Sequence, residues 1–235
     1  SPEALFRNFL YGNNYFEDEL GERSRDIYLP DCFGFGYALP SIAAHSNLIG
    51  FSTQKLSWGN TFAGETLPFD VGLWQGVDGN SIIANINYNG YTSSFSGGLR
   101  TNSDALARLQ RSPLDYISMI FGPGGDRGGA VGESTVSSIA QEFQSNTSSN
   151  VNVKFASTYE MFEDILAAGD EDKLETYDGE LLLKQHGSGG YTSRAISKRW
   201  NRRAELLGDA AERSNVASSY LGVSDYPTEL FEEIW

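Results

Sequence analysis

Apolar positions recur first at helical spacing and later in short runs that alternate with helical segments. Near the amino terminus they recur close to helical spacing, at Leu5, Phe6, Phe9, Leu10, Phe16 and Leu20. This spacing predicts a helix. Ser1 and Pro2 are typical of its first turn, and Gly21 is typical of its end.

Strands and helices are predicted to alternate from about residue 26 to residue 166. We expect strands near 26–29, 48–54, 116–121 and 151–156, a hairpin over 68–87 that turns at 78–80, and helices near 38–47, 104–109, 133–143 and 157–166. Such alternation predicts an α/β fold with a parallel sheet. Beyond the acidic stretch 169–175 the pattern becomes helical, with one apolar stripe over 196–211 and another helix that starts near Pro227. We therefore place a domain boundary at 172.

Composition and charge narrow the classes of partner. The chain has 235 residues and a formal net charge of −14. So acidic a surface repels phosphate backbones and anionic lipids, and we expect no nucleic acid and no membrane partner. No apolar run approaches the ~20 residues of a transmembrane helix, which predicts a soluble chain. The single cysteine, Cys32, excludes an intrachain disulfide but leaves the compartment open between bacterial cytoplasm and periplasm.

A lone carboxylate follows the first predicted strand. Asp31 comes after Pro30 and before Gly34 and Gly36, and a predicted helix follows. Catalytic residues of α/β proteins occur at the carboxyl ends of strands in this way. The alternative is that Asp31 caps the next helix or closes an Asx-turn.

A second carboxylate lies in a glycine-rich loop at 121–129, with the sequence FGPGGDRGG. Asp126 follows a predicted strand, as Asp31 does, so both side chains are candidates for one edge of the sheet. The loop also fits an ordinary turn, or a phosphate loop that lacks the expected lysine. Arg127 beside Asp126 would favour the ionised carboxylate.

Several motifs in series resemble the catalytic domain of the α-mannosidases of glycoside hydrolase family 38. They are PDCFGFG at 30–36, FSTQKLSW at 51–58, a segment that includes WQGVDGNS over 67–83, the glycine-rich loop at 121–129, and 187–205. The resemblance covers nearly the whole chain. It implies that 1–172 is the second half of a catalytic α/β domain, and that 173–235 begins a three-helix middle domain.

The resemblance also implies roles for both carboxylates. Asp31 would be the nucleophile of a retaining hydrolase that cleaves α-linked mannose from glycans, and Asp126 would be its acid/base. Family members hold zinc under the sugar, and Asp31 would be one ligand. The other family ligands come from a His-x-Asp pair and from a later His-Asp motif. Neither motif occurs here, where the two histidines are His45 and His186. We therefore expect zinc only in the complete enzyme and little activity from this chain alone.

Candidate sugar contacts follow from the same motifs: Gln54, Lys55, Trp58, Trp74, Asp78 and Tyr191. Each also has a structural reading. Trp74 suits a core, Asp78 with Gly79 suits a turn, and Tyr191 suits the cap of the following helix.

Other functions stay open on the sequence alone. One is a non-catalytic carbohydrate-binding fragment. Another is an assembly fragment that self-associates through an unpaired sheet edge or completes a partner holding the missing catalytic half. A metal-dependent deacetylase would need its metal histidines within this chain, which has only two.

Overall fold

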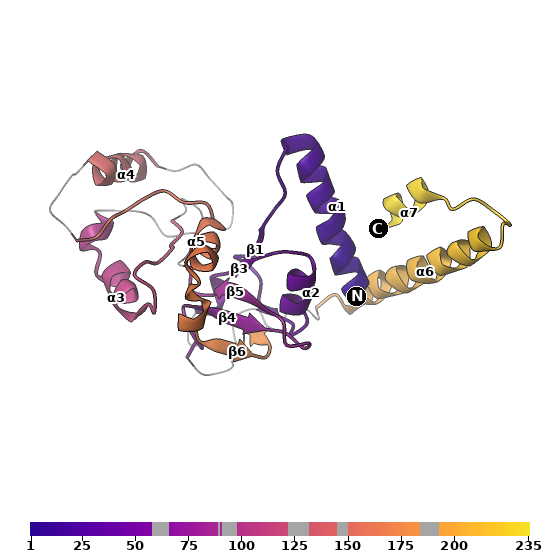
Figure 1. Cartoon of the computed structure of the whole chain (residues 1–235), viewed down its shortest axis with the longest axis horizontal. Helices are drawn as coiled ribbons and strands as arrows, with labels where there is room; N and C mark the ends of the chain where they lie inside the picture. The colour runs from indigo at the N-terminus through magenta and orange to yellow at the C-terminus, as the bar shows by residue number, and fades with distance from the viewer. Residues whose placement is uncertain (58–65, 89, 91–97, 122–131, 145–149, 184–192) are drawn as a thin grey trace. The chain divides into compact units, whose positions relative to one another are not determined.

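The computed structural model describes residues 1–57, 66–88, 90, 98–121, 132–144, 150–183 and 193–235 (Figure 1). The chain forms two compact units. One is Arg25–His186, and the other joins Ser1–Ser24 to Gly187–Trp235. This division differs from the boundary at 172, which rests on the change of pattern along the sequence and stays a prediction.

The first unit is built on a five-stranded sheet of order β1-β3-β5-β4-β6. Its strands are β1 (Asp26–Tyr28), β3 (Gly50–Ser52), β4 (Val71–Gln75), β5 (Ser81–Asn85) and β6 (Thr176–Asp178). Every neighbouring pair is parallel except the β4–β5 hairpin. The parallel sheet and the hairpin at 78–80 are thereby confirmed. Strands β2 (Gly34–Phe35) and β7 (Leu181–Leu182) form a separate antiparallel pair.

Helices lie where the spacing predicts them. In the sheet unit these are α2 (Leu39–His45), α3 (Ser103–Arg111), α4 (Glu133–Gln144) and α5 (Glu160–Ala168), with short 3-10 helices η1 (Lys55–Ser57), η2 (Leu99–Thr101) and η3 (Asp170–Lys173). The start of α5 is fixed by the Glu160 carboxylate, which accepts from the backbone N–H of Ser157 at 2.8 Å. Its end is fixed by Gly169, whose φ of 68° is left-handed.

The two faces of the sheet have different cores. On one face α5 packs in an apolar cluster of Val71, Ile83, Leu114, Met161, Phe162, Ile165 and Leu174. Gly50 faces the same way, because a Cβ added there would overlap the Phe162 ring. Successive strand residues point to opposite faces, so Phe51 lies on the other side. There its ring contacts Phe35 and the fully buried Trp74.

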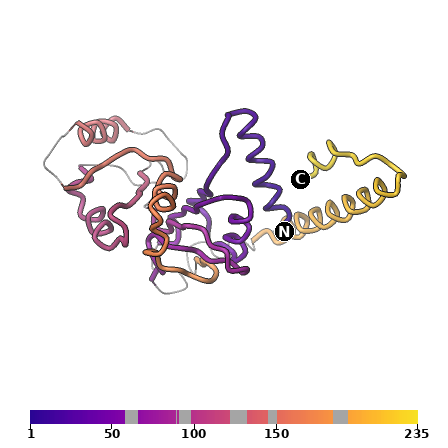
Figure 2. Tube along the Cα trace, viewed as in Figure 1, coloured from indigo at the N-terminus to yellow at the C-terminus, as the bar shows by residue number. Residues whose placement is uncertain are grey.

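The second unit is helical. It contains α1 (Pro2–Leu20), α6 (Ala195–Tyr220) and α7 (Thr228–Ile234), and Figure 2 shows the chain turning back after α6 into α7. The caps predicted for α1 are confirmed, because the Ser1 hydroxyl accepts from Ala4 and Gly21 is left-handed. None of the described residues of α1 is buried, and in α6 only Gly208 is. Across the described residues, no helix has both the length and the apolar character that a membrane span requires.

Two predicted strands were wrong. The segments 116–121 and 151–156 are irregular rather than strands. The first is joined to its neighbour through the N–H of Ile120, which donates to the carbonyl of Tyr88 at 3.0 Å without a continuing ladder. The second is tied by Arg100, whose Nε donates to the Val151 carbonyl at 3.1 Å. An apolar run favours a strand only where a neighbouring edge can pair with it.

Replacing Gly50 with alanine should destabilise the sheet unit. The added methyl group meets the Phe162 ring, and overpacking of this kind costs about 1–3 kcal/mol. Gly36→Ala is the matched control, because nothing lies within 4 Å of an added Cβ there; we expect it to change stability by less than ~0.5 kcal/mol. Urea unfolding, monitored by near-UV circular dichroism, measures the free energy of unfolding of both variants. Equal stability of the two variants would contradict the packing described.

Candidate active site

Three parallel strands end together at one edge of the sheet. The register pairs Tyr28 of β1 with Ser52 of β3, and Ser52 with Asn85 of β5. Segments that follow these residues therefore meet at the carboxyl edge, which is where open α/β sheets bind ligands. The segment after β1 contains Asp31, and the segment after β3 contains Lys55.

The segment that directly follows β3 continues the pairing beyond the strands and holds the Asp31 turn. The N–H of Leu29 donates to the Ser52 carbonyl at 3.0 Å. The Thr53 hydroxyl then donates to the Leu29 carbonyl at 2.8 Å, and the Gln54 side-chain amide donates to the Pro30 carbonyl at 3.0 Å. Gln54 is completely buried. Gln54 therefore binds the turn that carries Asp31, and its predicted contact with a sugar stays a prediction.

Asp31 forms an ion pair with Lys55. The two side chains differ greatly in exposure, at 59% for Asp31 and 4% for Lys55. The Lys55 Nζ also lies 5.4 Å from the centroid of the Phe33 ring. A buried ammonium beside a carboxylate favours the ionised form of that carboxylate. The arrangement thus suits a nucleophile, with a fixed cation on one side and an accessible carboxylate on the other.

The surroundings of Asp31 do not fit a zinc site by themselves. Cys32 adjoins it, but burial and the Asp31 charge raise the pKa of the thiol and oppose a thiolate ligand. Within the described ranges, no group of three or more His, Cys, Asp or Glu residues is placed to hold a metal ion. A structural zinc site takes about four donors. Asp31 alone supplies one carboxylate, and its described partner is a cation.

Two further residues at this edge were missed by the sequence reasoning. Asn85, at the end of β5, is buried and donates to the Ser118 carbonyl at 3.3 Å. Tyr88 is also buried, accepts from the Ser118 hydroxyl at 3.0 Å, and packs edge-on against Tyr28. Burial raises the pKa of Tyr88. Their position at the end of the predicted hairpin 68–87 is the available signal, because β5 ends at the same edge as β3.

Two predicted sugar contacts lie elsewhere. Trp74 is fully buried, and its indole N–H donates to the Gly179 carbonyl at 2.8 Å.

Asp78 lies in the β4–β5 turn, before β5 begins and hence at the edge opposite Asp31. It accepts from the Ser41 hydroxyl at 2.6 Å and lies 2.7 Å from the His45 Nε2. Hydrogen bonds from Ser41 above all, and from Asn80, hold the pKa of Asp78 well below its usual range. It therefore joins α2 to the hairpin.

Three predicted residues, Trp58, Asp126 and Tyr191, lie outside the described residues. That Asp31 and Asp126 lie at one edge of the sheet accordingly stays a prediction. Of the predicted site residues within the described ranges, the structure brings together Asp31, Gln54 and Lys55.

Comparison with known proteins gives a consistent set of relatives. Residues 1–180 match the family described as glycosyl hydrolases family 38, N-terminal domain. Alpha-mannosidase 2C1 of Homo sapiens is 30% identical over 241 residues, covering 100% of this chain and 22% of the relative. The Alpha-mannosidase of Saccharomyces cerevisiae is 31% identical over 246 residues, covering 100% of this chain and 22% of the relative.

A solved structure shares the fold. The crystal structure of an alpha-mannosidase from Enterococcus faecalis V583 aligns with 99% of this chain and 27% of its own, with a TM-score of 0.61 and 18% sequence identity. The chain thus resembles part of a larger α/β structure. It spans about a fifth of the length of the curated relatives.

The Asp31–Lys55 pair can be tested through stability. Asp31→Asn should lower the free energy of unfolding by about 1–3 kcal/mol, because it removes the negative charge that faces a buried ammonium. Lys55→Met removes that ammonium, so the double variant should recover much of the loss. A double-mutant cycle from urea unfolding measures the coupling. Strictly additive effects would contradict a direct interaction.

Proposed function

Because the chain belongs to glycosyl hydrolase family 38, we propose that it is part of a retaining, zinc-dependent α-mannosidase that removes α-linked mannose from glycans. The match of residues 1–180 to the family carries this proposal. The anchoring of Asp31 at the carboxyl edge supports it. The chain would comprise part of the catalytic α/β domain over 1–172 and the start of a three-helix middle domain over 173–235.

The proposed mechanism uses two carboxyl groups. Asp31 attacks the anomeric carbon to form a glycosyl-enzyme intermediate, and Asp126 protonates the leaving oxygen and later activates water. Retention requires the two groups to lie roughly 5–5.5 Å apart. Lys55 keeps Asp31 ionised and oriented between turnovers, while Gln54 and Thr53 fix the turn that carries it.

The sugar contacts are correspondingly fewer than the motifs suggested. Trp58 and Tyr191 remain proposed contacts for the mannose ring, since aromatic faces pack against the apolar faces of sugars. Gln54 and Lys55 act through the Asp31 turn, and we propose that they position the nucleophile. Trp74 and Asp78 serve the core and the hairpin.

Zinc is proposed only for a longer polypeptide. In that setting Asp31 would supply one oxygen ligand, and a metal ion bound there would act as a Lewis acid and orient the sugar hydroxyls. Among the described residues, no group of three or more His, Cys, Asp or Glu is placed to complete such a site around Asp31.

Activity tests the proposal directly. The chain alone should not hydrolyse an aryl α-mannoside, whereas a chimera that carries this sequence in the matching segment of the Saccharomyces cerevisiae relative should. Asp31→Asn should reduce turnover of the chimera by at least about 10³-fold, as expected for loss of a nucleophile. Initial rates with and without a chelator measure both effects.

The control for that experiment is Asp104→Asn. Its side chain is 59% exposed, as is that of Asp31, and it is paired with Arg108. This variant should retain the turnover of the chimera. An active chimera that tolerates Asp31→Asn would overturn the catalytic assignment. Chelator-sensitive turnover by the chain alone would overturn the view that it is incomplete.

Zinc binding by the isolated chain is a separate prediction. Calorimetric titration at pH 7 should give a Kd weaker than about 10 μM, because an isolated carboxylate cannot supply the ~4 donors of a tight site. Asp31→Asn should leave the titration unchanged within about twofold. Submicromolar affinity that is lost in Asp31→Asn would show that this chain contains a complete metal site.

A further inference from the structure

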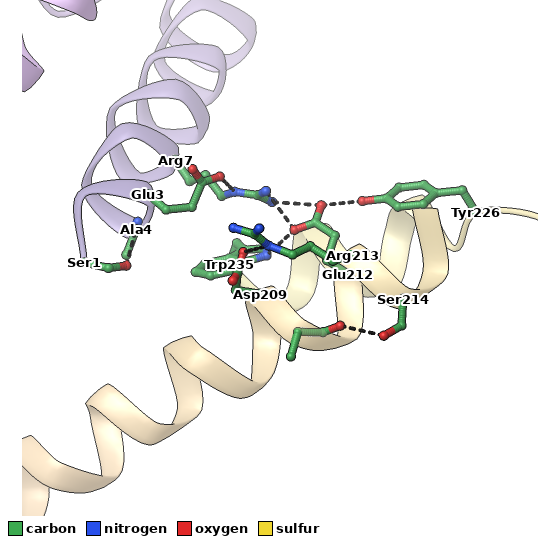
Figure 3. Close-up of polar contacts among 11 residues, drawn as sticks. Ser1, Glu3, Ala4, Arg7, Asp209, Glu212, Arg213, Ser214, Tyr226 and Trp235 are labelled. Atoms are coloured by element: carbon green, nitrogen blue, oxygen red, sulfur yellow. Dashed lines mark hydrogen bonds and ion pairs between the residues drawn. The ribbon is translucent and has the colours of Figure 1, made fainter. Parts of the chain in front are cut away.

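One carboxylate connects the elements of the helical unit. Glu212 of α6 accepts from the guanidinium of Arg7 in α1, at 2.7 Å on one oxygen and 3.2 Å on the other. It also accepts from the indole N–H of Trp235, just after α7, at 3.0 Å, and from the hydroxyl of Tyr226. Figure 3 shows these donors converging on the carboxylate from separate parts of the chain.

The position of this cluster matters because the unit has little apolar core. In α7 the buried residue is Phe231, and α6 buries Gly208 against the side chains of Ile234 and Trp235. Long apolar side chains of α1 and α6 remain exposed, including Leu20 at 71% and Trp200 at 57%. Hydrophobic burial therefore contributes less here than in the sheet unit.

The Glu212 carboxylate is itself largely shielded from water. Its side chain is 14% exposed, and that of Arg7 is 20% exposed. The Arg7 guanidinium also lies 4.6 Å from the centroid of the Trp235 ring and bonds to Glu3 at 2.7 Å. Charge-assisted hydrogen bonds in such a setting are about twice as strong as neutral ones.

Other charged groups around Glu212 are mostly paired with one another. On α1, Glu3 bonds to Arg7 and also attracts Arg213. On α6, Asp209 is bonded to Arg213 at 2.9 Å. On the side of α7, Tyr226 is a titratable neighbour of Glu212, and it also interacts electrostatically with Tyr11 of α1. A second bridge joins the amino group of Ser1 to Glu205 at 2.8 Å.

Protonation of Glu212 would weaken every contact in this cluster. Burial alone would raise its pKa, but hydrogen bonds from Tyr226, Arg7 and Trp235 outweigh burial and hold the pKa below the ordinary 4.5. The bonds correspondingly raise the pKa of Tyr226. A carboxyl whose pKa falls on folding contributes stability above the unfolded pKa, and this stability is lost as pH falls through the folded pKa.

We propose that Glu212 is an acid-sensitive clasp: its protonation releases α1 and α7 from α6, while the sheet unit keeps its fold. Protonation of Asp31 or Asp78 also costs the sheet unit stability, but its apolar core does not titrate and continues to hold the fold. The described residues of the helical unit form no comparable core, so burial does not offset the loss of the ionic contacts there.

The chain carries an internal pair of reporters for this transition. The indole N–H of Trp235 bonds to Glu212, whereas that of Trp74 bonds to a carbonyl in the sheet unit. In nitrogen-15 spectra of the full chain, the Trp235 indole signal should shift with a midpoint below pH 4.5. The Trp74 signal should stay in place over the same range. Trp235→Phe identifies the first signal, and amide exchange in α1 should accelerate by about tenfold or more after the transition.

Two variants separate the clasp from general acid unfolding. In Glu212→Gln the Trp235 signal should already be displaced at pH 7 and should no longer titrate between pH 5 and 3. Asp209→Asn, one turn earlier on α6 and bonded to Arg213, should titrate as the parent chain does. A common midpoint for Trp235 and Trp74, a Trp235 signal unmoved down to pH 3, or an unchanged titration in Glu212→Gln would each overturn the proposal.

Discussion

The site depends on hydrogen bonds that continue the pairing of β1 and β3 beyond the ends of the two strands. After the backbone ladder ends at Tyr28 and Ser52, the Thr53 hydroxyl and the Gln54 amide take over as donors to the next two carbonyls. Pro30 has no N–H and cannot continue a ladder in both directions. Side chains of the segment after β3 therefore fix a turn that backbone pairing alone would not hold. This places Asp31 against the buried Lys55 ammonium.

Much of this arrangement was predictable, because it follows from local patterns. The caps of α1, the turn at Gly79 and the strand before Asp31 each have a short-range signal in the residues themselves. The irregular segments 116–121 and 151–156 lack such a signal, since whether an apolar run pairs depends on which edges are available. The same limit applies to the site. Gln54 turns inward to reach the Pro30 carbonyl, and Asp78 lies at the far edge because β5 runs parallel to β3; both depend on which strands become neighbours.

The two units illustrate different ways of holding short elements together. In the sheet unit, helix α5 contributes Met161, Phe162 and Ile165 to a continuous apolar cluster, and polar groups such as Asp78 fasten its margins. In the helical unit, the ion pair of Glu212 and Arg7 joins helices whose long apolar side chains are largely exposed. Apolar burial responds mainly to temperature, whereas paired charges respond to pH and salt. The units should therefore differ in the conditions that loosen them.

The contact between Gly50 and Phe162 has a consequence for how this sequence can change over time. The Phe162 ring of α5 fills the space beside Gly50 of β3 that a larger side chain at position 50 would need. A descendant sequence that gains a side chain at position 50 while keeping the ring at position 162 carries an overpacked layer, and one that loses the ring alone carries a cavity. Each single change lowers stability, so these two positions, far apart along the chain, restrict one another's substitutions.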